Sequence, residues 1–150
     1  MCDVTISVFE LMKLFPNKES ARKYIEDQRW NGQPECPFCS SKTVSQMRGK
    51  KVEFYWCKNC RSEFSVRTGT IFERSHIPLH KWLFAMYLIV TARKGISSLQ
   101  LSKELGITQK SAWFLMRRIR KACEDGDQLL QKVVEIHETY IGGKEKNKHG

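Results

Sequence analysis

The sequence lacks a long apolar run, since its longest uninterrupted stretch, Trp82–Val90, holds nine residues. A helix needs ~20 apolar residues to cross a bilayer, so this stretch is too short for a membrane span. The N-terminus also lacks the basic and then apolar segments of a secretion signal. We therefore expect a soluble, intracellular chain with no segment in a membrane.

Acidic residues are scarce relative to basic ones. The 150 residues include 26 Lys and Arg against 16 Asp and Glu, which gives a net charge of +10 and a pI near 9.5. This balance favours a polyanionic partner, nucleic acid first and an anionic membrane surface second. The length allows one medium domain or two or three small modules, each with a modest core.

The cysteines form an ordered pattern. There are six, and four of them make two CxxC pairs separated by seventeen residues: Cys36, Cys39, Cys57 and Cys60. This spacing is typical of a structural zinc site with four thiolate ligands and no open position. Disulfides are the weaker alternative in a reducing compartment, where Cys2 and Cys123 also have no evident partners. A thioredoxin-like redox motif would need a βαβ context, which the sequence does not indicate.

The segment between the pairs predicts a zinc ribbon over residues 36–75. TVSQMRGKKVEFYWC indicates a strand, a turn at Arg48–Lys51 and a second strand from Val52 to Trp56, and SEFSV can add a third strand. Such a small sheet buries little apolar area, so zinc must supply much of its stability. Among its many cations, Lys50 and Lys51 are candidates for phosphate contact. A solvated basic surface is the alternative.

Two helices are predicted ahead of the ribbon, in residues 1–35. Phe9, Met12 and Phe15 fall at helical spacing, and Pro16 closes that segment. Asn17 can cap a second helix that runs to about Gln28. Nothing in this segment suggests chemistry.

Residues 76–125 predict a helical module. A helix from about Leu79 to Ala92 is apolar almost all round and should be buried. A helix-turn-helix is predicted at about 97–122, with Ser97 or Ser98 capping the first helix, Gly106 in the turn and Thr108 capping the second.

The second of these helices has two faces. Its predicted core stripe is Ala112, Met116, Ile119 and Cys123. Candidate DNA-binding residues lie on the opposite face and at the N-terminal end of this helix: Gln109, Lys110, Ser111, Phe114, Arg117, Arg118 and Lys121. Residues 93–123 hold eight Lys or Arg and one acid, so we favour a helix in a DNA major groove over a merely solvated basic face.

Four stretches, in order and spacing, resemble the zinc-ribbon insertion-sequence transposases of bacteria: CPFC with WCKNC, TGTIFERSHIPLHKW, LSKELGITQKSAWFLMRRIR and HETYIGGKEKNKH. The resemblance implies a zinc ribbon and a helix-turn-helix that bind the inverted repeats at the ends of the element. It also implies a ribonuclease H-like catalytic domain of the DDE type, which cuts and rejoins DNA with acidic residues and two Mg²⁺ or Mn²⁺ ions. The resemblance further implies that the protein acts on DNA in the bacterial cytoplasm, at the nucleoid.

The catalytic domain of that family opens with a strand that ends in the aspartate of DETYIGGK, and His137 stands at this position here. A neutral imidazole cannot bridge two hard cations as a carboxylate does. Glu135 and Glu138 are adjacent carboxylates, and Glu135 would share the strand face of His137. The chain ends before further acidic residues of such a site. We therefore expect residues 126–150 to be a poorly ordered stub of the catalytic domain, and the chain to be inactive alone.

The expected fold is thus an α+β set of small modules: N-terminal helices, a four-cysteine zinc ribbon, a helix-turn-helix module and the truncated first strand of a ribonuclease H-like domain. The expected function is that of the DNA-binding part of a truncated transposase, with double-stranded DNA as partner and a second copy or an intact transposase as further candidates. The alternative is a zinc-ribbon regulatory or protein-interaction module in which DNA binding is incidental.

Overall fold

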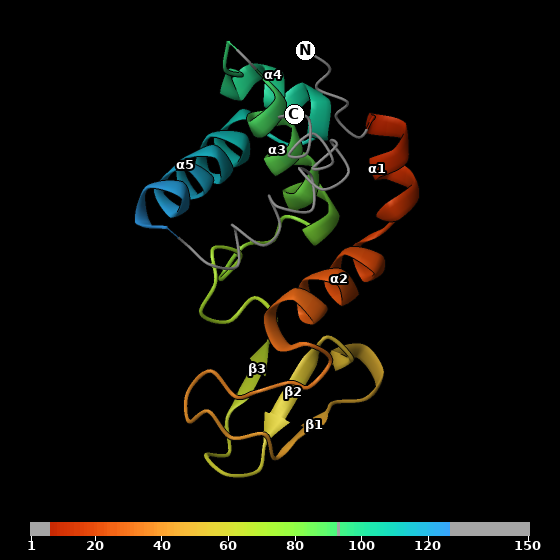
Figure 1. Cartoon of the computed structure of the whole chain (residues 1–150), viewed down its shortest axis with the longest axis vertical. Coiled ribbons are helices and arrows are strands. Elements are labelled where there is room, and N and C mark those ends of the chain that lie inside the picture. The colour runs from red at the N-terminus through yellow and green to blue at the C-terminus, as the bar shows by residue number, and fades with distance from the viewer. Residues whose placement is uncertain (1–6, 93, 127–150) are drawn as a thin grey trace, which may run out of the picture. The chain divides into compact units, whose positions relative to one another are not determined.

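The computed structural model describes residues 7–92 and 94–126 of the chain. They form two compact units (Figure 1): residues 22–76, here named the ribbon unit, and a helical unit that joins the stretch up to residue 21 with the residues from 77 onward. Within the described residues there are five α-helices and one three-stranded sheet, so the predicted α+β class is confirmed. In this part of the chain no helix is long and apolar enough to cross a membrane.

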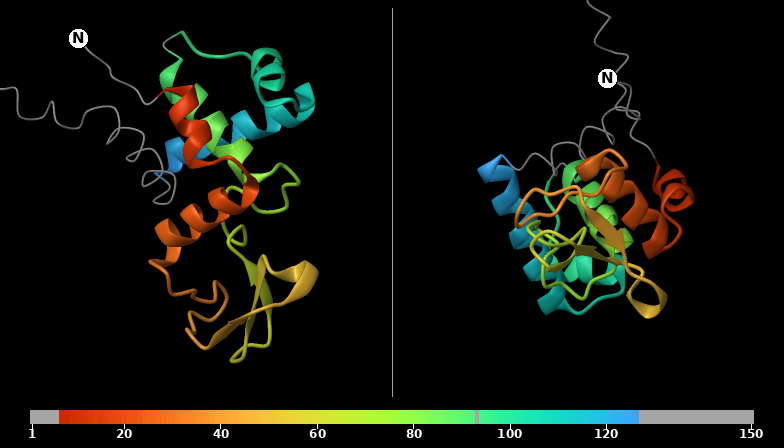
Figure 2. Two further views of the ribbon diagram at one scale, coloured as in Figure 1. Left: turned by 90° about the vertical axis from the view of Figure 1, so that its right-hand side faces the viewer. Right: turned by 90° about the horizontal axis from the view of Figure 1, so that it is seen from below.

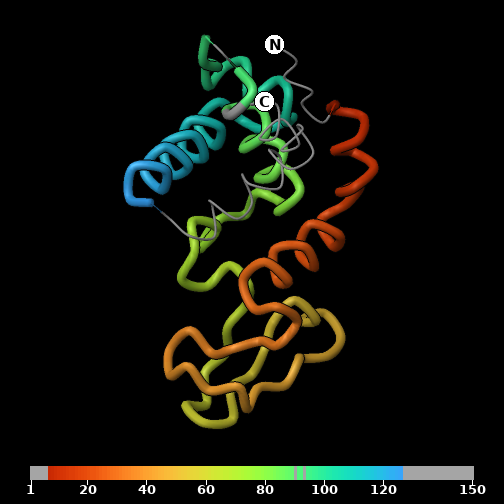
Figure 3. The backbone as a smooth tube through the Cα atoms, viewed as in Figure 1, coloured from red at the N-terminus to blue at the C-terminus, as the bar shows by residue number. Residues whose placement is uncertain are grey.

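The ribbon unit contains an antiparallel sheet of three short strands, in the spatial order β1 (Val44–Gln46), β2 (Phe54–Cys57) and β3 (Glu63–Ser65). A short 3-10 helix, η1 (Gly49–Lys51), connects β1 to β2 where the sequence predicts a turn. The register pairs Val44 with Cys57 and Tyr55 with Phe64. Figure 3 shows the chain path of this unit as the orange-to-yellow-green part of the tube. The predicted three strands are confirmed.

The core of the ribbon unit is aromatic. Tyr55 on β2 and Phe64 on β3 stack with ring centroids 5.7 Å apart. Trp30, the last residue of α2 (Lys18–Trp30), meets both rings edge-on at 5.5 and 5.9 Å. Each such pair contributes about 0.5–1.5 kcal/mol beyond the burial of its area. The end of α2 is therefore packed directly onto the sheet.

The helical unit is built around α3 (Leu79–Thr91), which packs against both α4 (Ser98–Leu105) and α5 (Gln109–Asp125). Figure 2 shows these helices as the green-to-blue part of the ribbon. Their core includes side chains that are at most 1% exposed: Trp82, Leu83, Met86, Leu101 and Leu115. The predicted burial of the apolar helix is confirmed, and Trp82 is a core residue.

The first two helices begin at caps. Ser7 forms a capping box with Glu10 at the start of α1 (Val8–Leu14), and the Asn17 side chain accepts from the Ser20 amide at the start of α2, as predicted. In α1 the buried residue is Leu11, with Phe15 buried after it, whereas Phe9 and Met12 are 77% and 52% exposed. The apolar spacing of Phe9 and Met12 thus marks an exposed face, because Leu11 and Phe15 lie on the side that packs.

Candidate metal centre and nucleic-acid interface

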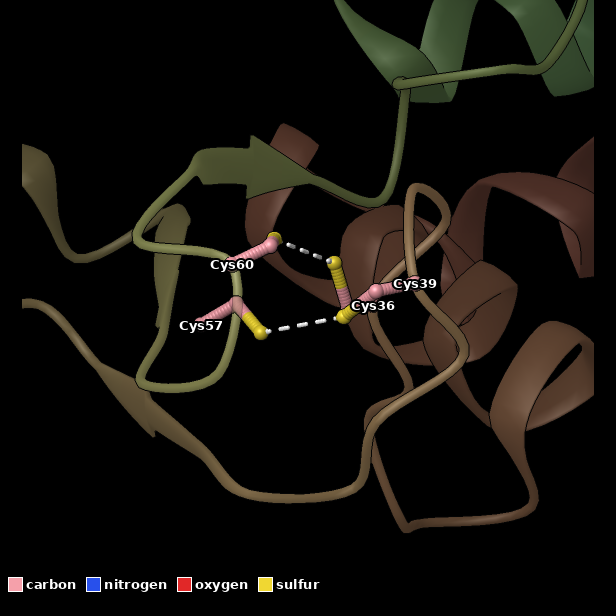
Figure 4. A group of neighbouring side chains, drawn as sticks. All are labelled: Cys36, Cys39, Cys57 and Cys60. Atoms are coloured by element: carbon pink, nitrogen blue, oxygen red, sulfur yellow. Dashed lines mark hydrogen bonds between the residues drawn. The ribbon is translucent and has the colours of Figure 1, made fainter.

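The four cysteines of the two CxxC pairs converge at one point of the ribbon unit (Figure 4). The Sγ atoms of Cys36 and Cys60 lie 3.6 Å apart, and those of Cys39 and Cys57 lie 3.5 Å apart. All four sulfurs lie within 4.8 Å of one another. Each short distance joins one thiol from the first pair to one from the second, so the two turns face each other.

These distances fit a tetrahedral zinc ion. With Zn–S bonds of ~2.3 Å, the sulfurs of a tetrahedral site lie about 3.8 Å apart, close to the observed separations. A disulfide requires an S–S distance of about 2.05 Å, and the four cysteines are free thiols. All four ligands come from the protein, so a zinc ion held here has no open position for a substrate. The site can stabilise the fold and cannot itself perform catalysis.

Both CxxC turns have the same local backbone. The amide of Cys36 donates to the Ser41 carbonyl and the amide of Cys57 donates to the Ser62 carbonyl, each at 2.9 Å. The residue after each second cysteine has a positive φ, 59° at Ser40 and 56° at Arg61. Left-handed conformations of this kind cost free energy for residues other than glycine. The left-handed conformation recurs after both CxxC pairs. We infer that this strained backbone is needed to direct the two thiols of each pair toward one point.

The environment prepares two of the thiols differently for a metal. Burial raises the pKa of the Cys36 thiol to about 11, whereas a hydrogen bond from the Asn59 side chain lowers the pKa of the Cys39 thiol to about 6. At neutral pH the metal-free protein therefore holds a thiolate at Cys39 and a thiol at Cys36. Since the thiolate is the zinc ligand, Cys36 must lose its proton as the metal binds.

The basic side chains of the ribbon unit differ in their exposure and in their hydrogen-bond and ion-pair partners. Lys50 is exposed, whereas Lys51 pairs with Glu63 across the sheet at 3.1 Å in a partly exposed ion pair. Arg67 is half-buried and donates to the Ser75 carbonyl at 3.1 Å, and its burial lowers the pKa of its guanidinium. Lys50 is thus available to a ligand, and Arg67 holds the loop that follows β3.

The last two helices meet at a short connection. Ser97 caps α4 by accepting from the Gln100 amide, and Thr108 caps α5 by accepting from the Ser111 amide. Gly106 ends α4 with φ 66°, a left-handed conformation that glycine adopts at little cost. The predicted caps and the turn glycine are confirmed, and α5 extends three residues beyond the predicted end at Ala122.

The α5 helix has a continuous buried face. Its buried residues are Ala112, Leu115, Met116, Ile119 and Ala122. Cys123, which the sequence pattern placed in the core stripe, is exposed, and Ala122 takes its place. Both are small residues next to each other in the chain, so the spacing alone could not choose between them. Leu115 completes the stripe beside Met116.

The opposite face of α5 is basic. Gln109, Lys110, Arg117 and Lys121 are exposed, and Ser111, Phe114 and Arg118 are partly exposed. Two residues outside the sequence-based set share this surface, because Arg120 is exposed and Trp113 is 53% exposed. The sequence offered a signal for Trp113, because it stands four residues before Arg117 and so falls on the same side of the helix.

Two guanidinium groups stack on aromatic rings of α5. The Arg117 Cζ lies 5.0 Å from the centroid of Trp113, and the Arg118 Cζ lies 4.4 Å from that of Phe114. Both arginines follow their ring by four residues, which is one helical turn. Cation–π contacts at such distances contribute about 0.5–1 kcal/mol at exposed sites and restrict the arginine side chains. The basic face therefore presents partly preorganised guanidinium groups.

The predicted catalytic position lies outside the described residues. His137, Glu135 and Glu138 all belong to residues 127–150, as does the predicted stub over 126–150 apart from Gly126, which ends α5. Within the described ranges, the four-cysteine cluster is the group of side chains placed to hold a metal ion.

Residues 16–63 match the family model of the transposase zinc-ribbon domain. Over 131 residues the chain is 30% identical to a protein of Halobacterium salinarum whose printed name is "Uncharacterized protein in transposable element ISH50". That alignment covers 87% of this chain and 44% of the other protein, so the chain spans less than half the length of this relative. No solved structure matches the chain. Both matches confirm the resemblance indicated by the sequence motifs, and the domain match together with the four-cysteine cluster indicates a structural zinc.

Proposed function

The chain carries the zinc-ribbon domain of insertion-sequence transposases, and from this premise we propose that its described part binds double-stranded DNA at the terminal inverted repeats of an insertion element. In this proposal α4 and α5 form a helix-turn-helix, and α5 lies in the major groove. The zinc ribbon supplies a second basic surface along the DNA.

One observation carries the proposal, which is the separation of α5 into a buried apolar face and an exposed basic face. Ala112, Met116 and Ile119 are at most 5% exposed, whereas Arg117 and Lys121 are exposed. Because α3 and α4 pack on α5, the fold fixes which face of the helix remains available. The charges on that face are therefore presented together.

The dimensions of α5 suit a major groove. Its 17 residues give a length of about 26 Å at ~1.5 Å per residue, and a helix of ~10–12 Å diameter enters a groove ~12 Å wide. Gln109, Lys110 and Ser111 lie at its N-terminal end, the part of a recognition helix that approaches base edges. Arg117, Arg120 and Lys121 lie further along and can reach phosphates or guanine.

The ribbon would contribute affinity and stability to this complex. Lys50 is exposed on η1, and further exposed cations flank the metal centre at Lys42, Lys58 and Arg61. Contacts with phosphate add affinity without sequence preference and weaken as salt rises. We therefore assign base recognition to α5 and mainly phosphate contact to the ribbon.

Strand cleavage is a separate matter. The family resemblance implies carboxylates that hold Mg²⁺ or Mn²⁺, and His137 stands at the first of these positions. Imidazole offers one softer nitrogen and no negative charge to such ions. We propose that this chain by itself binds the repeats and does not cut them.

The test is a salt titration of DNA affinity with matched variants. Exchange of Arg117 and Arg118 for alanine should weaken binding and reduce the slope of log K against log salt by up to about 1.8, because each phosphate contact contributes ~0.9. The control exchanges Lys13 and Lys23, exposed cations of α1 and α2, so that it loses the same net charge. Equal losses in both variants would show that overall charge, and not α5, governs binding.

A second candidate function rests on α1. Phe9 and Met12 are 77% and 52% exposed, and exposed apolar side chains grouped on one helix are typical of a protein contact. In this reading the chain is a regulatory or interaction module. This second function would be favoured if the chain captured a protein partner equally well at low and high salt and retained no DNA.

A further inference from the structure

An open hollow of about 460 Å³ lies where the N-terminal ends of α4 and α5 meet. Its lining residues come from both helices: Ser98, Gln109, Lys110 and Trp113. The Gln109 amide nitrogen lies 3.5 Å from the Ser98 hydroxyl oxygen, so polar side chains of the two helices meet at this hollow. It lies within the helical unit, on the exposed side of α5.

The hollow has two chemically different sides. Trp113 supplies an apolar indole that is 53% exposed. Lys110 is exposed and carries an ammonium group, which donates hydrogen bonds and cannot accept them. A ligand that fits both sides needs an apolar group next to a hydrogen-bond acceptor.

Resting on the proposed function, we propose that Trp113 is a specificity-determining residue that receives the methyl group of a thymine in the major groove. Thymine is the base whose major-groove edge combines an apolar group, the C5-methyl, with an acceptor, O4. The methyl packs on the Trp113 indole while O4 accepts from Lys110. Cytosine presents an amino donor to the same ammonium group and is rejected.

Arg117 keeps the indole in place for this contact. Its guanidinium carbon lies 5.0 Å from the Trp113 ring centroid, so the arginine stacks on the ring from the next turn of α5. That contact occupies one side of the indole and leaves the rest of the ring to the hollow. Trp113 is not needed for the fold in the way that Trp82 is, because Trp82 is fully buried.

The experiment removes one methyl group from the DNA. The zinc-loaded chain is used to select binding sites from a pool of random-sequence duplexes. In the selected duplex each thymine is then replaced singly by deoxyuridine, which lacks the C5-methyl and retains O4. One replacement should weaken binding about fourfold, which corresponds to burial of one methyl group.

Variants assign that effect to Trp113. In Trp113→Ala the same replacement should make no difference, and Trp113→Phe should retain part of it. Lys110→Ala should weaken binding to the thymine and uracil duplexes equally, because both bases retain the O4 that accepts from Lys110. Phe9→Ala is the control, since it removes an aromatic side chain that is 77% exposed on another helix.

The outcomes separate the inference from the function on which it rests. Selection of a site that depends on Arg117 but shows no methyl effect overturns the role of Trp113 and leaves DNA recognition by α5 intact. A methyl effect that persists in Trp113→Ala also overturns it. A chain that selects no site at all removes both the proposed function and this inference.

Discussion

Replacement of Cys39 by serine should empty the metal centre and unfold the ribbon unit. Cys39 is partly exposed and its Sγ lies 3.5 Å from that of Cys57. Serine is nearly as large as cysteine, so the change leaves little cavity in the core. Its hydroxyl is not a thiolate ligand, and the site would keep three of its four sulfur ligands. The effect of this variant therefore reports on the metal and not on packing.

The expected magnitude follows from the size of the core. Burial of Tyr55 and Phe64 contributes roughly 3–6 kcal/mol together, at about 1.5–3 kcal/mol for each fully buried large side chain, and Trp30 is only partly buried against them. Structural zinc contributes about 10–16 kcal/mol in small metal-dependent domains. Zinc binding thus contributes more free energy to folding than burial of the aromatic core does. Loss of zinc should therefore unfold the ribbon unit and not merely lower its melting temperature.

The assay combines metal content with hydrogen exchange. Wild-type protein should hold one zinc per chain and protect the amides of β2, whereas Cys39→Ser should hold little zinc and lose that protection. Amides of α3 should stay protected, because its core of Trp82, Leu83 and Met86 belongs to the helical unit. Cys123→Ser is the matched control, since Cys123 is an exposed cysteine of α5.

Unchanged zinc content and unchanged protection of β2 in Cys39→Ser would refute the four-sulfur site. Equal losses in the Cys123→Ser control would show that the effect does not come from the four-cysteine cluster.

Three further predictions concern pH, the cap of α5 and catalysis. Zinc affinity should fall throughout the range as the pH is lowered from 8 to 5, because the Cys36 thiol, whose pKa lies near 11, must release its proton to bind the metal. The fall should steepen below about pH 6, where the Cys39 thiol also becomes protonated. A zinc titration at several pH values checks this, and an affinity independent of pH between 8 and 5 would contradict it. Thr108→Ala should destabilise the helical unit by about 1 kcal/mol, because it removes the hydrogen bond that the Ser111 amide donates to the Thr108 side chain. Thermal unfolding measures this loss of stability. Thr43→Ala is the control, since Thr43 is an exposed threonine outside the helices. The purified chain should not cleave end-repeat DNA in Mg²⁺ or Mn²⁺, and cleavage that His137→Ala abolishes would overturn this expectation.

The spacing of the cysteines predicted the metal centre, because each CxxC turn can direct two thiols at one ion and two such turns supply the four ligands of a tetrahedral site. Helix caps were equally readable, since Asn17, Ser97 and Thr108 each stand just before an amphipathic run. These features depend on residues that lie within a few positions of one another, so they can be predicted from the sequence alone.

Features that depend on tertiary packing were predicted less well. Ala122 and Cys123 are neighbours of similar size, and the packing of α3 and α4 on α5 decided which one is buried. Phe9 and Met12 have helical spacing, yet Leu11 and Phe15 form the side of α1 that packs. The predicted DNA-binding set also left out Trp113, although it is 53% exposed and stands four residues before Arg117 on the same face of α5.

The most direct measurement is the affinity of the zinc-loaded chain for a duplex that carries the terminal repeat flanking its own gene, titrated with salt against a scrambled duplex of the same composition. We expect tighter binding to the repeat at every salt concentration and a steep loss of affinity for both duplexes as salt rises. Equal affinity for the two duplexes would contradict specific recognition of the repeats and would leave a basic zinc-binding chain without sequence preference.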